Sequence, residues 1–301
     1  MTIWRVALSA FAIATYLALP ALVRADEAAT DAYVEAMMKE HATDSPVAGA
    51  SRSAADDLHA DSGFAIAEEK AITFGDAKGG AQVSGYLVWP AGAPVRSGII
   101  VIHEWWGLND HIRVMARALA QHGYGALAVD LYGGKTATAP EEAKSLMAAA
   151  MADESKTLAR LQAAAELLRE QRGVERLGVI GWCFGGGWAL RTGLSLGSQA
   201  SAVVMYYGRL VDDEATLAGM QAPLLGVFAE QDGGIPVAAV RRFEAALGKL
   251  GKTAEIKVYP GVDHAFANPS GNRFNAPAAT DAWERTLAFF ARHLAPKTPP
   301  S

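Results

Sequence analysis

The sequence predicts a single α/β domain, built on a mostly parallel sheet of about eight strands that is flanked by helices. From about residue 64 onward, short apolar runs alternate with longer stretches of helical periodicity. Several runs, such as GIIVIH at 98–103, are continuously apolar, which is typical of parallel strands buried on both faces. The composition, 51% apolar and 20% charged over 301 residues, is that of a globular protein able to form a sizeable core.

The expected elements begin with an antiparallel pair of strands at 69–74 and 83–89, which are joined through a turn at Gly79-Gly80. Asn109 or Asp110 can cap the first helix of the alternating part, because both side chains accept backbone N–H groups. The further expected strands are 98–103, 125–130, 176–181, 202–207, 223–229 and 254–259. The further expected helices are a long region at 140–172 that bends near Ala152-Asp153, then 186–196, a short acidic helix, 237–250 and 281–294.

The first 25 residues have the pattern of a secretory signal peptide. Residues 1–5 carry one positive charge, residues 6–23 are almost entirely apolar, and Val23-Arg24-Ala25 precedes an acidic pair. A retained membrane anchor is the alternative, because about 18 apolar residues can just span a bilayer. Pro20 and the cleavage pattern favour removal. We therefore expect an exported protein, periplasmic or secreted, without stable membrane insertion after cleavage.

Residues 26–63 are alanine-rich and polar, with interruptions at Ser45-Pro46 and Gly49. They are expected to form a linker or a lead that wraps the surface, with one short helix at 33–40 and little to bury. The α/β domain is expected over residues 64–296, followed by a tail at 297–301.

Charge and cysteine content exclude several classes of protein. The net charge of −5 leaves no basic excess to neutralise phosphates, so nucleic acid is not an expected partner. The single cysteine excludes an intramolecular disulfide and a zinc site made of cysteines. We expect neither a metal nor a cofactor, and the sequence carries no signal for an oligomeric state.

That cysteine, Cys183, lies in the pattern G-x-C-x-G between an expected strand and an expected helix. In the serine version of this pattern, the turn is so tight that the nucleophile adopts strained backbone angles and its neighbours must be small. The start of a helix also favours thiolate over thiol. The alternatives are a structural buried cysteine and a phosphate or dinucleotide loop, but the glycine spacing does not fit such a loop.

A base and an acid follow Cys183 in the order expected of an α/β-hydrolase. In parallel sheets, active sites lie where the strands end, and Asp232 and His264 each come just after an expected strand. The order Cys183, Asp232, His264 is that of nucleophile, acid and histidine in this fold. Asp263 is an alternative acid, but it is adjacent to His264 and poorly placed to reach its Nδ1. The other histidines weighed lie in the lead or on expected helices: His41, His59, His111, His122 and His293.

An acyl-transfer site also needs N–H donors for the oxyanion. The backbone N–H of Phe184, directly after the nucleophile, is one candidate. The second is expected in the loop after strand 98–103, and we assign it to the N–H of Trp105. The alternative is that Trp105 and Trp106 are core or lid aromatics.

These motifs together resemble the dienelactone hydrolase (carboxymethylenebutenolidase) family over about residues 64–294. The segments that carry the resemblance are HEWWGLN at 103–109, DLYGG at 130–134, GWCFGGG at 181–187, Asp232 and GVDHAF at 261–266. The resemblance implies an α/β-hydrolase fold and a triad of Cys183, Asp232 and His264. It further implies that Glu104 holds the thiol at rest and releases a thiolate when substrate binds. A carboxylate beside a thiol would itself keep the thiol protonated; an ordinary surface glutamate is the alternative.

The sequence differs from the family at positions where family members bind their substrate. Family members that cleave dienelactone grip its carboxylate with arginines, whereas Asn268 stands soon after the histidine here, and Ala265 replaces a hydroxyl. Lys135, Asn268 and Arg273 are the candidate substrate-binding residues. The expected activity is hydrolysis of a small carboxylic ester or lactone. Alternatives are a thioesterase or acyl transferase on the same triad, a non-catalytic exported binding protein, and a cofactor-using oxidoreductase.

Overall fold

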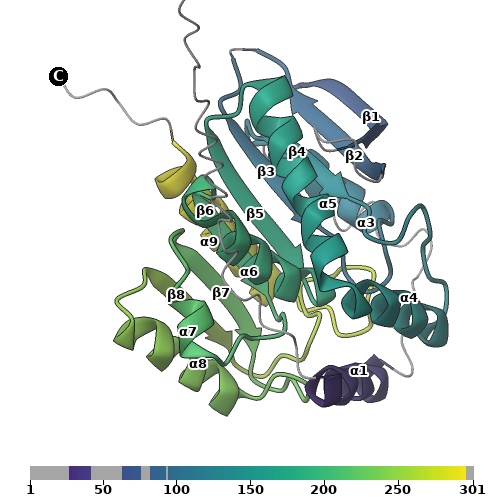
Figure 1. Cartoon of the computed structure of the whole chain (residues 1–301), viewed down its shortest axis with the longest axis vertical. Helices are drawn as coiled ribbons and strands as arrows, with labels where there is room; N and C mark the ends of the chain where they lie inside the picture. Colours follow the sequence, from purple (N-terminus) through teal and green to yellow (C-terminus); the bar gives the residue numbers. More distant parts are fainter. Residues whose placement is uncertain (1–26, 42–62, 76–81, 93, 296–301) are drawn as a thin grey trace, which may run out of the picture.

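The computed structural model describes residues 27–41, 63–75, 82–92 and 94–295, and within them it forms one eight-stranded sheet. The sheet order is β1-β2-β4-β3-β5-β6-β7-β8 (Figure 1). The predicted α/β class and mostly parallel sheet are confirmed. The strands are β1 (Ile66–Phe74), β2 (Val83–Pro90), β3 (Ser97–Ile102), β4 (Gly125–Val129), β5 (Arg176–Trp182), β6 (Ala202–Tyr206), β7 (Leu224–Ala229) and β8 (Ala254–Tyr259).

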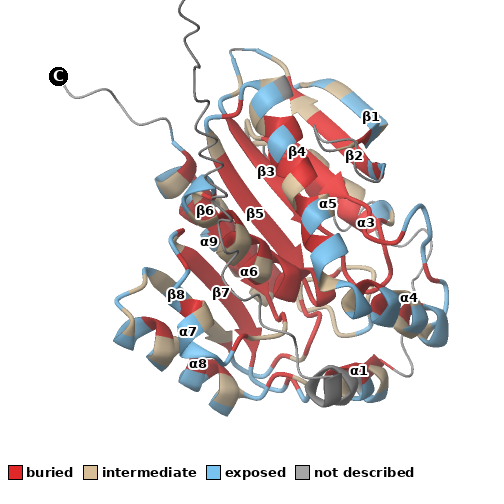
Figure 2. Ribbon diagram, in the orientation of Figure 1, coloured by how far each residue is buried: buried red, intermediate tan, exposed pale blue. Residues whose placement is uncertain are grey.

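Strand direction follows the predicted pattern. β1 and β2 form the expected antiparallel pair, β2 is also antiparallel to β4, and all other neighbours are parallel. The five strands from β4 to β7 in the sheet are buried almost throughout (Figure 2), because helices cover both faces. Because these strands are buried on both faces, their sequences are continuously apolar.

Helices α5 and α6 cross one face of the sheet, and α3 and α9 lie on the other (Figure 1). Asn109 caps α3 by accepting the N–H of Ile112 at 3.2 Å. The long helical region breaks at Asp153, as expected, and Asp153 caps the second part. The helices are α1 (Glu27–His41), α3 (Asp110–Gln121), α4 (Pro140–Ala152), α5 (Glu154–Glu166), a π-helical extension of α5 (Leu167–Gln171), α6 (Phe184–Leu196), a short 3₁₀ turn (Gly197–Gln199), α7 (Glu214–Leu217), α8 (Val237–Lys249) and α9 (Ala276–Leu294).

Helix α1 differs most from expectation. It is longer than the predicted 33–40 and lies beside the edge of the sheet at which the parallel strands end, packed against α4 (Figure 1). The expectation that it has little to bury is wrong, because Tyr33, Val34, Met37 and His41 are buried. These positions fall on one side of a helix at spacings of one, four and eight residues, so a single face is turned inward.

The predicted signal peptide and tail lie outside the described residues, and the division into a lead and a domain remains a prediction. Among the helices that the structure does describe, none combines the length and the apolar character needed to cross a membrane.

Candidate active site

Cys183 lies in a strained turn between β5 and α6. Its backbone angles, φ 56° and ψ −120°, are in a region that non-glycine residues rarely adopt. The turn is held by backbone bonds: the Cys183 N–H donates to the Tyr206 carbonyl at 3.0 Å, and its own carbonyl accepts the N–H of Gly186 at 2.9 Å. The position therefore has the geometry that the G-x-C-x-G pattern predicts.

The glycines around Cys183 provide steric clearance. A Cβ on Gly185 would lie 2.5 Å from the His103 carbonyl oxygen and closer still to that of Ile102. A Cβ on Gly181 would overlap the backbone of Gly185. Because a carbon atom does not approach backbone atoms this closely, α6 can pack against β5 and the end of β3 as it does only when both positions are glycine.

Asp232 and His264 form a buried pair. Nδ1 of His264 lies 2.8 Å from Oδ2 of Asp232, while Oδ1 accepts the backbone N–H groups of Gly234 at 2.9 Å and Ile235 at 2.7 Å. Burial raises the pKa of Asp232, but the charge of His264 and the three hydrogen bonds outweigh it, and the net pKa is below its ordinary value. Asp232 is thus an anion that holds one ring nitrogen of His264.

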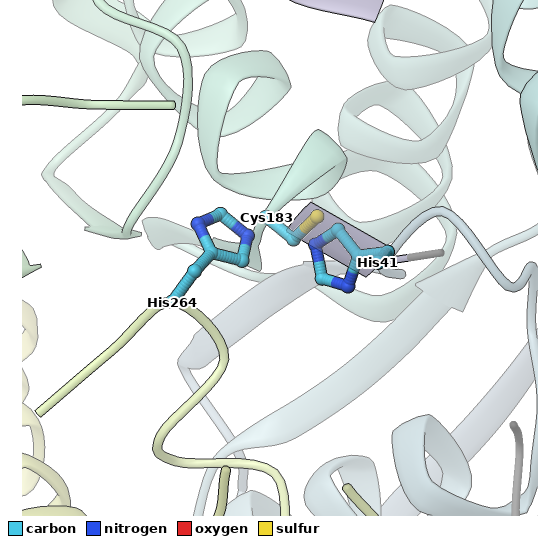
Figure 3. Close-up of side chains that lie close together, drawn as sticks. All are labelled: His41, Cys183 and His264. Atoms are coloured by element: carbon cyan, nitrogen blue, oxygen red, sulfur yellow. The ribbon is translucent and has the colours of Figure 1, made fainter. Parts of the chain in front are cut away.

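His264 turns its other ring nitrogen toward the sulfur of Cys183 (Figure 3). Burial alone lowers the pKa of His264; the negative charges of Asp232 and Cys183, with hydrogen bonds to both, raise it well above its ordinary value. The ring of Tyr207 packs at 4.9 Å from that of His264. The structure therefore brings the three residues Cys183, Asp232 and His264 together.

Glu104 is 2% exposed and accepts a hydrogen bond from Nδ2 of Asn268 at 2.6 Å. Asn268 was a candidate for substrate binding, and the structure places it against Glu104. The hydroxyl of Tyr207 is affected by both residues. Burial raises its pKa, and the negative charges of Glu104 and Cys183 raise that pKa further. Glu104 and Cys183 therefore both lie within electrostatic range of one buried hydroxyl.

His103 ties the ends of two strands together beside this site. One ring nitrogen accepts the Leu131 N–H at 3.1 Å, and the other donates to the Glu104 carbonyl at 2.6 Å. Burial lowers the pKa of His103 to about 4, so the ring stays neutral at ordinary pH. This link holds the loop after β3, which carries Trp105.

The two expected oxyanion donors lie at the start of α6 and in the loop after β3. Phe184 is the first residue of α6, and N–H groups at a helix start have no acceptor within the helix. Trp105 follows β3, and its side chain is buried against Trp106 at 4.8 Å between ring centroids. Their role as donors stays a prediction.

His41 is a site residue that sequence reasoning placed in the lead without a function. It is the last residue of α1, and its ring lies 5.0 Å from that of His264 and 4.7 Å from that of Trp105. Nη2 of Arg273 lies 2.6 Å from its Nδ1. The spacing of Tyr33, Met37 and His41 by four residues was the signal in the sequence.

Arg273, a candidate substrate-binding residue, thus contacts His41, and the ring of His41 in turn lies beside that of His264. Lys135 is exposed and lines a separate hollow beside β1 and β2. Within the part of the chain that the structure describes, the side chains close enough to share a metal ion are those of His41, Cys183 and His264, whose ligand atoms all lie within 4.8 Å of one another.

The model of the dienelactone hydrolase family matches residues 83–294. Protein usf of Aquifex pyrophilus is 33% identical over 225 residues, which cover 72% of this chain and 96% of that protein. A Saccharolobus solfataricus protein named "Putative carboxymethylenebutenolidase" is 30% identical over 249 residues, or 71% of this chain and 95% of that one. The crystal structure of a "Putative Dienelactone Hydrolase" from Klebsiella pneumoniae superposes with a TM-score of 0.66 at 30% identity, covering 75% and 99% of the two chains.

The matched region runs from β2 to α9 and includes Cys183, Asp232 and His264, whereas α1 and β1 precede it. The chain therefore belongs to the dienelactone hydrolase family and is a hydrolase of esters or lactones with the α/β-hydrolase fold.

Proposed function

We propose that this hydrolase cleaves a small carboxylic ester or lactone through a thiolate, with Cys183 as nucleophile, His264 as acid and base, and Asp232 as the group that orients His264. The observation that carries the proposal is the buried series in which Asp232 holds Nδ1 of His264 while the opposite ring nitrogen faces the sulfur. This is the arrangement that activates a nucleophile through a base and an orienting acid.

The reaction proceeds in two steps. The Cys183 thiolate adds to the substrate carbonyl, and the N–H groups of Phe184 and Trp105 stabilise the oxyanion, each worth ~2.7–4 kcal/mol of barrier. His264 gives its proton to the departing alkoxide as the C–O bond breaks, which leaves a thioester on Cys183. His264 then takes a proton from water, the hydroxide adds to the thioester, and the acid and the Cys183 thiolate are released.

Glu104 is proposed to control the charge of the thiol at rest. Its carboxylate is buried and fixed by Asn268, and a negative charge at this depth disfavours a second one on the sulfur. When substrate displaces this carboxylate, the penalty is removed, the thiol proton passes to His264, and the resulting thiolate attacks.

A hollow beside the nucleophile is the proposed place for the remainder of the substrate. It is a shallow, half-open hollow with a cavity volume of about 20 Å³, and it lies between Phe184 and Trp188 on α6 and Tyr33 on α1. Arg191 and Arg209 line the same hollow, and sequence reasoning did not find them. Glu154 lines it too and pairs with Arg191 at 3.4 Å, so the walls are apolar with one ion pair and the guanidinium of Arg209. A volume of this size holds about one water molecule, so a substrate group enters only where these side chains move apart.

The test is Cys183→Ala assayed with activated esters such as p-nitrophenyl acetate, alongside lactones and thioesters with and without a carboxylate. We expect hydrolysis to be abolished while circular dichroism shows an intact fold, because the variant loses the nucleophile and keeps the turn. Unchanged turnover would refute the assignment of Cys183. Hydrolysis of thioesters alone would favour a thioesterase. If the parent protein turns over none of these substrates and its Cys183 thiol resists iodoacetamide, the result would favour a non-catalytic binding protein.

A further inference from the structure

Helix α1 carries His41 into the centre of the active site. One ring nitrogen of His41, the sulfur of Cys183 and one ring nitrogen of His264 lie within 4.8 Å of one another. Figure 3 shows the two imidazoles on either side of the sulfur, each with a nitrogen turned toward it. The three side chains are buried, at 2%, 1% and 0% exposure, so they interact without screening by water.

Arg273 decides which nitrogen of His41 carries the proton. A guanidinium can only donate, so Nδ1 of His41, 2.6 Å from Nη2 of Arg273, is the acceptor. Neutral His41 then holds its proton on Nε2, and Nε2 is the nitrogen that faces the sulfur, because Nδ1 is engaged by Arg273. The ring thus presents an N–H donor to the reacting atom.

The same contact argues against a metal at this cluster. A metal ion needs the lone pair of the His41 nitrogen beside the sulfur, but Arg273 stabilises the tautomer in which that nitrogen is protonated. Metal-binding histidines donate their other nitrogen to a carboxylate or carbonyl, whereas His41 accepts from a cation. A guanidinium next to the ring would also repel the metal charge.

We propose that His41 is a third active-site group, which donates its Nε2 hydrogen to the Cys183 sulfur, and that Arg273 is the positioning residue that keeps the proton there. The proposal rests on the proposed function in that Cys183 is the nucleophile. A hydrogen bond to an ionised acceptor is stronger than one to a neutral acceptor, so His41 stabilises the thiolate over the thiol. Because α1 precedes the region 83–294 that matches the family, this group is an addition to the matched domain.

The proposal is tested by separating the donor from the volume of the side chain. His41→Leu keeps much of the volume and removes the N–H, whereas His41→Gln keeps an N–H donor at a similar reach. Lys39→Leu is the matched control, since Lys39 is exposed on the same helix. Each variant is made in the full chain, and its fold is checked by circular dichroism.

Two kinds of measurement are made at neutral pH. The first is the thiolate absorbance of Cys183, and the second is the steady-state kinetics with p-nitrophenyl acetate, which give kcat and KM. Cys183 is the only cysteine of the chain, so the difference from Cys183→Ser isolates its absorbance. In His41→Leu we expect the thiolate-to-thiol ratio and kcat to fall about tenfold, with KM changed little. His41→Gln should recover most of both. Arg273→Met should resemble His41→Leu, and Arg273→Lys, which still donates, should resemble the parent.

The proposal is overturned if His41→Leu matches the parent in thiolate content, or if His41→Gln is as impaired as His41→Leu. A faster His41→Leu enzyme would show that α1 blocks the site, and tight Zn²⁺ binding that depends on His41 would show a metal site; either result overturns the donor role. A parent protein that hydrolyses no ester but still loses thiolate in His41→Leu would refute the proposed function and leave the His41 contact standing.

Discussion

Replacing Asp232 with asparagine removes one charge from the site and leaves its shape. The asparagine oxygen can still accept the N–H groups of Gly234 and Ile235, which now bind Oδ1 at 2.9 and 2.7 Å. Its NH₂ group cannot accept from Nδ1 of His264, now 2.8 Å from Oδ2. His264 is therefore driven to the tautomer with its proton on the nitrogen that faces Cys183, and it loses the anion that stabilises its charged form.

The expected loss of kcat is about 10³–10⁴-fold, because the wrong tautomer cannot accept a proton from the nucleophile or from water. Burial, which lowers the pKa of His264, is then opposed only by the charge of Cys183 and the hydrogen bond to it, so the pKa of His264 falls from its raised value. The high-pH limb of the rate profile, where imidazolium is lost, should accordingly move to lower pH.

The same pair makes a pH-dependent contribution to stability. The pKa of His264 is raised on folding, so its contribution is full below 6.5 and is lost as the pH rises through the folded value. The pKa of Asp232 is lowered, so its contribution is full above 3.8 and is lost as the pH falls through the folded value. Asp232→Asn should thus cost most free energy of unfolding between pH 3.8 and 6.5.

Urea unfolding at a series of pH values and pH–rate profiles for p-nitrophenyl acetate measure the two effects. Asp263→Asn is the matched control, because Asp263 is the neighbouring carboxylate and accepts the backbone N–H of His264. A variant Asp232→Asn with kcat within a factor of about ten of the parent would refute the orienting role, since loss of this group costs far more in such triads.

Two further predictions concern the turn and the N-terminus. Gly185→Ala should lower the free energy of unfolding by about 3 kcal/mol in urea titrations, because its Cβ meets the backbone oxygens of Ile102 and His103; a stable, fully active variant would contradict the tight packing of α6 against the end of β3. We also propose export with cleavage after Ala25, so N-terminal sequencing of protein from the exported fraction should begin at Asp26, one residue before α1. Retention of the first 25 residues in a membrane fraction would instead indicate an anchor.

The sheet and the tight turn at Cys183 could be predicted from the sequence because their physical requirements are local. A continuous apolar run such as 98–103 follows from burial on both faces, and the glycines at 181 and 185 follow from a tight turn. The three residues of the predicted triad lie together because each follows a strand, and the fold brings strand ends together. Each of these constraints involves only residues that are close together in the sequence.

The residues that were missed act through contacts distant in sequence. His41 meets Arg273, more than 200 positions away, and nothing near either residue indicates the other. Asn268 was read as a substrate contact because it follows His264, but its partner is Glu104. An alanine-rich helix such as α1 also has weak amphipathic contrast, so its buried face was hard to distinguish.

In the proposed mechanism, two sets of groups act in opposite directions on the charge of the Cys183 sulfur. Glu104 is the group that we propose disfavours the thiolate; after burial, its negative charge also raises the pKa of the Tyr207 hydroxyl. His264, whose pKa is raised by Asp232, is proposed to favour the thiolate, as is the N–H of His41 that Arg273 keeps in place. Because all of these groups are shielded from water, a small displacement of one of them changes the charge on the sulfur. A substrate that moves Glu104 while leaving His41 and His264 in place would therefore create the nucleophile only when there is a carbonyl to attack.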